Sequence, residues 1–491
     1  MSIRGSMLNV GRYIVLLCGG VILVPLFLAT TVQASAPSIV MKVDPDSIDQ
    51  DQPTSDNTAF GFVSGLERSQ TMLGGMWGAR PWLSQYGVSF NLEETSEELG
   101  NVVGGTRRGF DYDGLTQMNL QMDTQRALGW YGGLFNISAL QIHGRDLSAE
   151  NLNTLQTSSG IEGSRSTRLW EMWYQQKFLD EDRLDLKMGQ QSLDQEFMVS
   201  SNANYFINTM MGWPMLPSAD LPSGGPAYPL SALGLRARGK PDDSFTVLGG
   251  LFNGSPANKS GVNNSGTGFP LDGGVLAIAE VQYAYPSLGA MVSADSSSEL
   301  SGTYKFGIWY DSEDFVDEEY NTGGLSLANP TSQAFPLQHH GNYGLYAVAD
   351  QMLWHSENLE DRTLNYFTRV MGTPLTDRNL VDFSMNAGFT LHEPIPLRDD
   401  DTLGLGVGYV DISNRVVRFD QSIASYNAGN YTPIKSGETF VEATYQYQAT
   451  PWWQLQPDLQ YVFNPGAGSA NNNGQRVKNE TILGVRTNIA F

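Results

Sequence analysis

Apolar and polar residues alternate one by one in many short segments of the chain. Residues 118–122 read Met-Asn-Leu-Gln-Met, and residues 458–461 read Asp-Leu-Gln-Tyr. Successive side chains of a β-strand point to opposite faces, so each such segment predicts a strand with one apolar and one polar face.

Sixteen segments show this alternation. Their lengths are close to the roughly 9–11 residues that a tilted strand needs to cross a bilayer. They span residues 86–94, 116–126, 130–142, 166–178, 183–190, 231–239, 244–252, 274–285, 301–311, 341–354, 362–371, 379–391, 402–412, 437–448, 453–463 and 479–491.

The connections between these segments alternate in length. Those after even-numbered segments are mostly short: 127–129, 179–182, 240–243 and 449–452. Those after odd-numbered segments are mostly long: 95–115, 143–165, 191–230, 253–273, 312–340, 413–436 and 464–478. Connections 286–300 and 372–378 depart from this order. Short turns on one rim and long loops on the other predict an all-β fold, a 16-stranded antiparallel transmembrane β-barrel.

The connection over residues 191–230 is polar and rich in Gly and Pro. Loops of this length are usually functional or disordered. A ring of sixteen tilted strands is on the order of 30 Å across, which side chains alone do not fill. We therefore expect residues 191–230 to fold into the lumen as a constriction loop; the alternative is an ordinary surface loop.

The strand that precedes this loop, residues 166–178, has two distinct faces. Its apolar face is predicted to carry Trp170, Met172, Tyr174 and Phe178. Its polar face is predicted to carry Glu171, Trp173, Gln175 and Lys177.

The start of the chain has the features of a secretory signal. Arg4 and Arg12 are followed by an apolar run to Leu28 and by Ala34-Ser35-Ala36, small residues typical of a cleavage site. We predict a signal peptide at 1–36, a flexible periplasmic lead at 37–65, a short N-terminal periplasmic segment at 66–85 and the barrel at 86–491. A retained membrane anchor is the alternative. The single cysteine, Cys18, lies in the predicted signal, so no disulfide is expected in the mature chain.

Composition narrows the class of protein. Charged residues make up 16% of the chain, against about 25% in soluble proteins. The mean hydropathy of −0.26 nevertheless argues against a helical membrane protein. Loss of residues 1–36 would change the formal net charge from −23 to −25, which argues against nucleic acid as a partner.

Several basic residues in the predicted strands lie on the polar face. They are Arg236, Arg238, Lys305, Arg369 and Arg486. Each would cost roughly 2–4 kcal/mol if it faced lipid at mid-depth, so we expect the polar faces to line the lumen.

A set of short motifs in a fixed order points to one family. Residues 75–83 contain Gly-x-Trp-Gly-x-Arg-x-x-Leu, and residues 169–171 read Leu-Trp-Glu. Residues 194–197 read Asp-Gln-Glu-Phe, and residues 226–229 read Pro-Ala-Tyr-Pro. From about Leu73 to Phe491 the chain resembles the OprB-type carbohydrate-selective porins of Gram-negative outer membranes. The resemblance implies sugar diffusion across the outer membrane. It also implies that the barrel-assembly machinery reads the C-terminal strand, which ends in Phe491.

Sugars present hydroxyl pairs and an apolar ring face, which Arg, carboxylates and aromatic side chains can bind. These residue types occur at predicted lumen or inward-loop positions, and we expect them to form the constriction. They are Arg107, Arg108, Glu171, Trp173, Asp194, Glu196, Arg236 and Arg238. The alternative is that each lines a wet wall or joins the loop to the wall by a salt bridge.

Signals for an enzyme or a metal site are weak. His339-His340 lacks the spacing of a zinc site, and the acidic residues 311–319 lack the spacing of a calcium-binding loop. We therefore expect no catalytic residues and no cofactor.

The predicted function is a passive outer-membrane porin for monosaccharides or small polyols. The alternatives are a general porin for small solutes and ions, and an adhesin or scaffold barrel. The expected partners are sugars in transit, outer-membrane lipid or lipopolysaccharide and, in a homotrimer, further copies of the chain.

Overall fold

The computed structural model describes residues 70–257, 263–286, 300–332, 335–356, 359, 362–427, 432–471 and 473–491. The predicted signal peptide and periplasmic lead lie outside the described residues. Within these ranges, no helix is long and apolar enough to span a bilayer.

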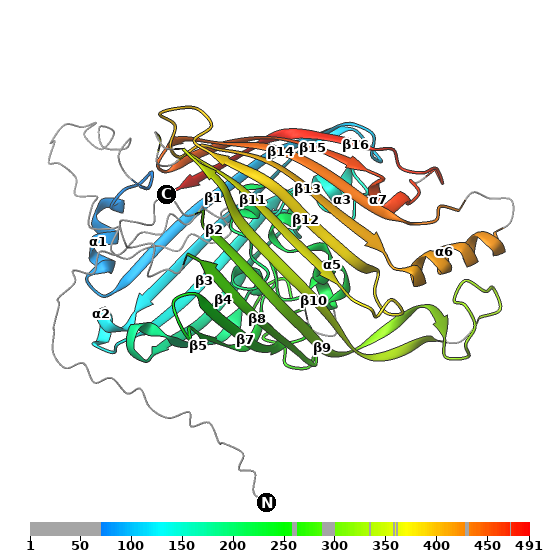
Figure 1. Ribbon diagram of the computed structural model, residues 1–491, viewed down its shortest axis with the longest axis horizontal. Helices are drawn as coiled ribbons and strands as arrows, with labels where there is room; N and C mark the ends of the chain where they lie inside the picture. Colours follow the sequence, from blue (N-terminus) through cyan, green and yellow to red (C-terminus); the bar gives the residue numbers. More distant parts are fainter. Residues whose placement is uncertain are drawn as a thin grey trace, which may run out of the picture. The chain divides into compact units, whose positions relative to one another are not determined.

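The described residues form a closed antiparallel barrel of sixteen strands (Figure 1). Each strand pairs with its neighbours in the chain, and β1 pairs with β16 to close the ring. The strands are β1 (Val88–Val103), β2 (Gly109–Asp123), β3 (Gly133–Gly144), β4 (Ser166–Phe178), β5 (Leu184–Gln191), β6 (Ala232–Gly239), β7 (Phe245–Asn253), β8 (Val275–Tyr285), β9 (Gly302–Asn321), β10 (Pro336–His355), β11 (Thr363–Gly372), β12 (Val381–His392), β13 (Thr402–Ile412), β14 (Gly437–Thr450), β15 (Trp453–Phe463) and β16 (Glu480–Ala490). The predicted fold class, strand number and order are confirmed.

The two faces of the wall follow the predicted alternation. Large apolar side chains such as Leu251, Phe306 and Leu405 are exposed on the outer face, whereas polar Glu280 and Asn386 on the inner face are buried. An apolar exterior facing hydrocarbon and a polar interior are what a membrane barrel requires.

Two predicted loops are wrong because strands continue through them. β1 runs to Val103 and β2 starts at Gly109, so most of 95–115 is strand. β9 extends to Asn321 and β10 begins at Pro336, which shortens the predicted loop 312–340. These extensions carry polar side chains on both faces, such as buried Glu97 and exposed Glu98 on β1, so the apolar-polar alternation is lost although backbone pairing continues.

The predicted orientation of Trp170 is also wrong. Pairing between β3 and β4 shifts register between Ile137 and Ala139, opposite Met172 and Leu169. This bulge changes which side chains of β4 face inward. As a result Trp170 is fully buried in an inner cluster with Leu140 and Ile161, whereas the prediction placed it on the lipid-facing side.

The segment before the barrel is anchored to the end of the chain. It contains η2 (Met76–Gly78) and α1 (Ala79–Ser84), within the segment 66–85 that was predicted to precede the barrel. Arg80 in α1 donates hydrogen bonds to the carbonyl oxygens of Gly74 and Phe491. The arginine of the Gly-x-Trp-Gly-x-Arg motif therefore fixes the C-terminus at the start of the barrel.

Candidate functional site

The connection between β5 and β6 folds into the barrel, as expected. It contains η4 (Leu193–Gln195), η5 (Ala203–Tyr205), α4 (Thr209–Gly212), α5 (Met215–Asp220) and η6 (Pro222–Gly224). Figure 1 shows these short helices inside the ring of strands. The ends of β5 and β6 place the constriction loop at residues 192–231.

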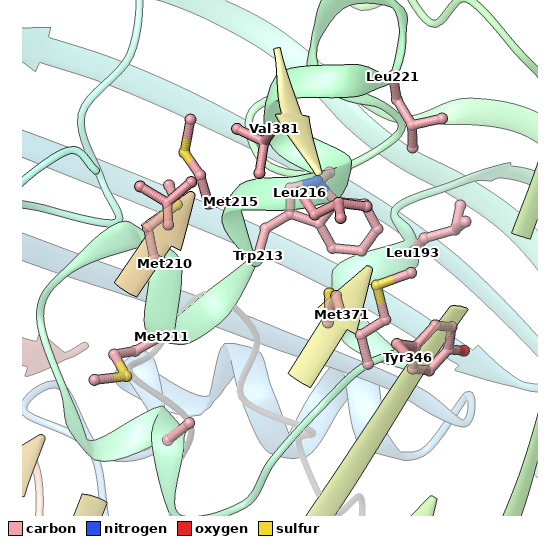
Figure 2. Packing of buried hydrophobic residues seen from close by; sticks show 14 of the residues in the cluster. Leu193, Met210, Met211, Trp213, Met215, Leu216, Leu221, Tyr346, Met371 and Val381 are labelled. Atoms are coloured by element: carbon pink, nitrogen blue, oxygen red, sulfur yellow. The ribbon is translucent and has the colours of Figure 1, made fainter. Parts of the chain in front are cut away.

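The constriction loop packs an apolar side against the inner wall. Met210, Met211, Trp213 and Leu216 are buried in one cluster with Tyr346, Met371 and Val381 of the strands (Figure 2). Burial of each such side chain stabilises the folded state by roughly 1.5–3 kcal/mol, so this packing holds the loop in one position against the wall.

Arg369 on β11 holds the loop backbone. Its guanidinium donates to the carbonyl oxygens of Met198 (3.2 Å), Met210 (2.6 Å), Met211 (2.7 Å) and Gly212 (2.8 Å). Arg is suited to this role because its planar fork carries five N–H donors. The predicted inward orientation of Arg369 is confirmed.

Carboxylates of the wall bind the amide groups of the same loop. Glu280 accepts from the Met198 N–H at 2.9 Å, and Asp350 accepts from the Asn202 N–H at 3.1 Å. Glu442 accepts from the Asn208 N–H at 3.2 Å. Wall anions thus satisfy loop N–H groups while Arg369 satisfies loop carbonyls, which fixes a backbone that has little regular structure.

A second inward segment was not expected. The connection between β3 and β4, residues 145–165, contains α3 (Leu147–Glu150) and then crosses to the far wall. Glu438 on β14 accepts from the N–H groups of Leu155 (2.9 Å) and Gln156 (2.8 Å). Thr157 Oγ1 donates to Thr209 Oγ1 at 2.6 Å, so the two inward segments support each other.

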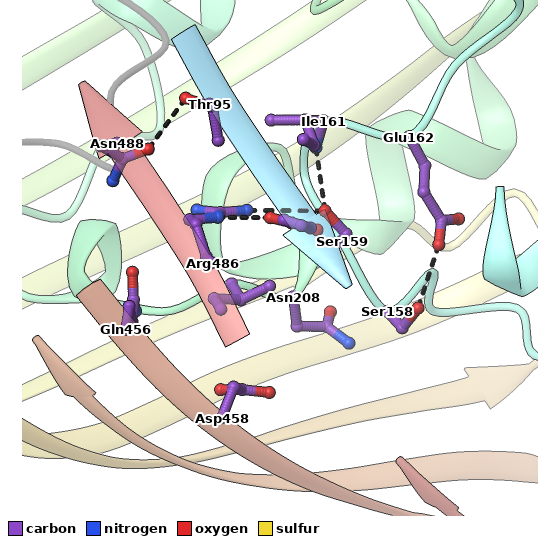
Figure 3. Close-up of polar contacts among 12 residues, drawn as sticks. Thr95, Ser158, Ser159, Ile161, Glu162, Asn208, Gln456, Asp458, Arg486 and Asn488 are labelled. Atoms are coloured by element: carbon purple, nitrogen blue, oxygen red, sulfur yellow. Dashed lines mark hydrogen bonds and ion pairs between the residues drawn. The ribbon is translucent and has the colours of Figure 1, made fainter. Parts of the chain in front are cut away.

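Figure 3 shows where this second segment meets the strands. Arg486 on β16 pairs with Glu97 and donates to Ser159 Oγ at 3.4 Å. Gln460 on β15 donates to the Ser158 carbonyl at 2.8 Å. The sequence carried one signal for this contact: Arg486 and Gln460 are polar residues on predicted inward faces, and such side chains need hydrogen-bond partners.

Four of the predicted site residues meet in a cluster on β4, β5, β6 and the constriction loop. Lys187 lies 2.8 Å from Glu196 Oε1, and Arg236 Nε lies 2.6 Å from Glu196 Oε2. Asp185 pairs with Arg236 and, at 2.6 Å, with Arg238 Nε. Lys187 Nζ also lies 4.2 Å from the centre of the Trp173 ring. We call Trp173, Asp185, Lys187, Glu196, Arg236 and Arg238 the ionic cluster.

Exposure divides the ionic cluster in two. The side chains of Asp185, Lys187 and Arg236 are nearly inaccessible, whereas Glu196 is 20% and Arg238 30% exposed. Burial would raise the pKa of Glu196, but Lys187 and Arg236 outweigh it and lower this pKa to about 2. Glu196 is therefore a carboxylate at neutral pH.

Glu171 and Asp194 bind the base of the constriction loop. Glu171 accepts from the Ser192 N–H at 2.9 Å and from the Trp173 indole at 3.3 Å. Asp194 accepts from Ser192 Oγ at 2.6 Å and from the Tyr228 N–H at 2.9 Å.

Arg107 and Arg108 are not brought to the ionic cluster. They lie in the connection between β1 and β2 and are exposed. Arg107 donates to Asn151 Oδ1 at 2.7 Å and pairs with Glu150 at 3.3 Å. It therefore joins the β1–β2 connection to the second inward segment at the long-loop rim.

The histidines and acidic residues at the same rim pair with one another. His339 Nε2 lies 2.8 Å from Asp317, and His340 Nδ1 lies 3.0 Å from Asp314. In the part of the chain that the structure describes, no three His, Cys, Asp or Glu side chains are grouped to hold a metal ion.

A closed barrel with an apolar exterior and a polar lumen narrowed by an inward loop is an outer-membrane porin. The model of the carbohydrate-selective porin, OprB family, matches residues 107–491, and the chain belongs to this family. It is a sugar-selective channel integral to the bacterial outer membrane.

Individual relatives agree with this assignment. The chain is 24% identical over 449 residues to Porin B of Pseudomonas aeruginosa, covering 86% of this chain and 92% of that protein. It is 24% identical over 414 residues to the putative porin QuiX of Acinetobacter baylyi, covering 81% and 89%. The high-pH structure of Pseudomonas putida OprB matches the fold with a TM-score of 0.75 at 22% identity, covering 87% of this chain and 99% of that one.

Proposed function

We propose that the protein lets neutral monosaccharides or small polyols diffuse passively past the edge of the constriction loop, without catalysis. The observation that carries this proposal is the ionic cluster. Buried partners hold Glu196 and Arg238 in place while both side chains stay partly exposed. A fixed carboxylate and a fixed guanidinium accept from and donate to hydroxyl groups, as a sugar requires.

The other predicted residues have supporting roles in this proposal. Trp173, Lys187 and Arg236 orient the exposed pair, and Glu171 and Asp194 hold the base of the loop. Arg107 and Arg108 lie at the long-loop rim, where they would meet the sugar before the ionic cluster does. Binding at each position is expected to be weak, because a conducting site must release its solute readily.

The sugar site is tested by single-channel recording of Arg238→Ala in planar bilayers, with and without glucose. We expect glucose to reduce the current through the unmodified protein and to do so at least several-fold less effectively in the variant. Arg183→Ala is the matched control, since Arg183 pairs with Glu181 and Asp243 at the short-turn rim. Equal glucose block in all three proteins would refute the proposed role of the ionic cluster.

The contribution of the rim arginines is measured separately with the Arg107→Ala/Arg108→Ala double variant. A weaker glucose block would support their place on the sugar path, and an unchanged block would remove them from it.

Liposome swelling separates the alternative functions. A sugar-preferring channel admits glucose faster than an amino acid of similar size, whereas a general porin admits both at similar rates. An adhesin or scaffold barrel would admit neither.

Two partners also belong to this proposal. The barrel-assembly machinery would read β16 and Phe491. A homotrimer would use part of the apolar outer wall for contact between copies, since the same surface suits lipid and a neighbouring subunit.

A further inference from the structure

A hollow of about 470 Å³ lies at the long-loop rim, apart from the ionic cluster. It is formed where β9 and β10 extend beyond the wall and α6 (Asn414–Tyr426) lies against β9, at the right of Figure 1. Its lining includes Asp317, Tyr320, Thr322, Leu337, His339 and Arg415. Sites for small molecules typically measure about 300–1,000 Å³, so a monosaccharide fits.

Arg415 on α6 has unused donors in this hollow. Its nearest carboxylate oxygens are Glu319 Oε2 at 3.7 Å and Asp317 Oδ2 at 3.9 Å, both longer than a hydrogen bond. Its Nε is buried and has no hydrogen-bond partner. The guanidinium lies over the Tyr320 ring, 4.8 Å from its centre, which holds the fork in one orientation. A ligand with paired oxygens would satisfy the Nη donors of this guanidinium.

The surrounding groups favour a neutral ligand. The Asp317 side chain is 1% exposed and accepts from His339 at 2.8 Å and from the N–H groups of Glu319 and Tyr320. Asp317 and Glu319 together place two carboxylates beside Arg415, which opposes the binding of an anion. Leu337 adds apolar surface to the lining. The hollow thus offers the Arg415 donors, the Asp317 acceptor and the apolar Leu337 side chain. A sugar ring has hydroxyl groups and an apolar face that can contact all three.

We propose that this hollow is an outer capture site for sugars, which binds a monosaccharide at the mouth before it reaches the constriction loop. The proposal rests on the proposed sugar-channel function. Arg415 donates to a pair of ring hydroxyls, and His339 contacts a further one. Capture at the mouth raises the local sugar concentration, so its effect on uptake is largest when external sugar is dilute.

Protection of an introduced cysteine tests the site directly. Thr322 is exposed and lines the hollow, and Thr322→Cys is nearly isosteric. The full chain carrying this change is treated with a water-soluble thiol reagent, with and without millimolar glucose. We expect glucose to slow the modification several-fold. Ser425→Cys, at an exposed position on α6, is the control and should react at the same rate with or without glucose.

Two further variants show whether Arg415 is responsible. Added to Thr322→Cys, Arg415→Gln should abolish protection, whereas Arg418→Gln should leave it intact. Arg418 is the matched control because it lies on the same helix and pairs with Glu319 at 3.2 Å, but does not line the hollow.

Three outcomes would overturn the capture site: no protection by glucose, protection that survives Arg415→Gln, or protection by inorganic phosphate in place of glucose. Liposome swelling with glucose is measured on the unmodified protein in parallel. Swelling without protection would refute the capture site alone, and absence of swelling would refute the sugar channel itself.

Discussion

Single charged side chains of the wall decide where the constriction loop lies. Arg369 is 1% exposed and bonds four loop carbonyls, and Glu442 bonds two loop N–H groups. A buried polar group left without a partner costs about 1–3 kcal/mol. Each wall residue therefore favours one position of the loop over others that leave the same groups unpaired.

Arg369→Met should loosen the constriction loop without unfolding the barrel. The substitution leaves the carbonyls of Met210, Met211 and Gly212 without their donor, at a cost of about 1–3 kcal/mol each. We expect higher and noisier single-channel currents in planar bilayers. Arg476→Met, at the exposed rim, is the control. Currents that match the unmodified protein would contradict this role of Arg369.

Acid should release the link between Glu196 and the wall. Its pKa is lowered from 4.5 in the free side chain to about 2 in the folded protein. A lowered carboxyl pKa stabilises the folded state fully above pH 4.5, and the stabilisation is lost as the pH falls toward about 2. Current noise in the unmodified channel should therefore rise over this pH range.

The variant Glu196→Gln identifies the group responsible for this acid effect. It has no charge to lose, so its noise should already be raised at neutral pH and should change less on acidification. An acid response equal to that of the unmodified protein would assign the effect to other carboxyl groups.

At the scale of elements, β13 is shaped to receive the constriction loop. Its inward-facing positions include Gly404 and Gly406. A Cβ atom at Gly406 would lie 2.7 Å from Met211 Cε and 2.8 Å from Phe206 Cε1. The glycines of β13 therefore leave space on the inner wall, and the Phe206 and Met211 side chains of the loop fill it.

Gly406→Val should displace the loop side chains that β13 accommodates. Overpacking of this kind costs about 1–3 kcal/mol. We expect a lower unfolding temperature, measured by heat-modifiable migration on gels, together with altered conductance. Gly239→Val on β6 is the control, since a Cβ there meets no atom within 4 Å. Equal effects of the two substitutions would argue against specific packing on β13.

For the whole molecule, the barrel and the constriction loop are separable. Every strand pairs with its chain neighbours, and β1 with β16 completes the ring. The ends of the loop already meet, since the Leu193 N–H donates to the Pro226 carbonyl at 2.7 Å. A short linker between these two positions would leave the strand ladder complete.

Replacing residues 194–225 with a short Gly-Ser linker should therefore give a folded, wider channel. Several wall groups that the loop covers are polar, such as Glu280, Asp350 and Arg369, and water can take the place of their loop partners. We expect a several-fold rise in conductance and loss of glucose block. Conductance equal to that of the full chain would show that the loop does not limit the pore.

The alternation of residue types by itself determined the sixteen strands and their order, because each strand must separate lipid from water along its whole membrane span. It also determined the faces of their side chains except where a bulge intervenes, as at Trp170. The extensions of β1, β9 and β10 were not predicted, because they carry polar side chains on both faces and so lack the alternation. The constriction loop was predicted from length and composition, but its path was decided by pairing with distant wall residues such as Arg369.

Only the tertiary structure decided the arrangement of the candidate site. It joined Glu196, Arg236 and Arg238 into one cluster, placed Arg107 with Glu150 at the rim and turned Trp170 inward through a bulge. Residues 145–165 reached the lumen by bonding strands far away in sequence. The alternation reports which face a side chain occupies, whereas its partners depend on register shifts and loop paths that the pattern does not encode.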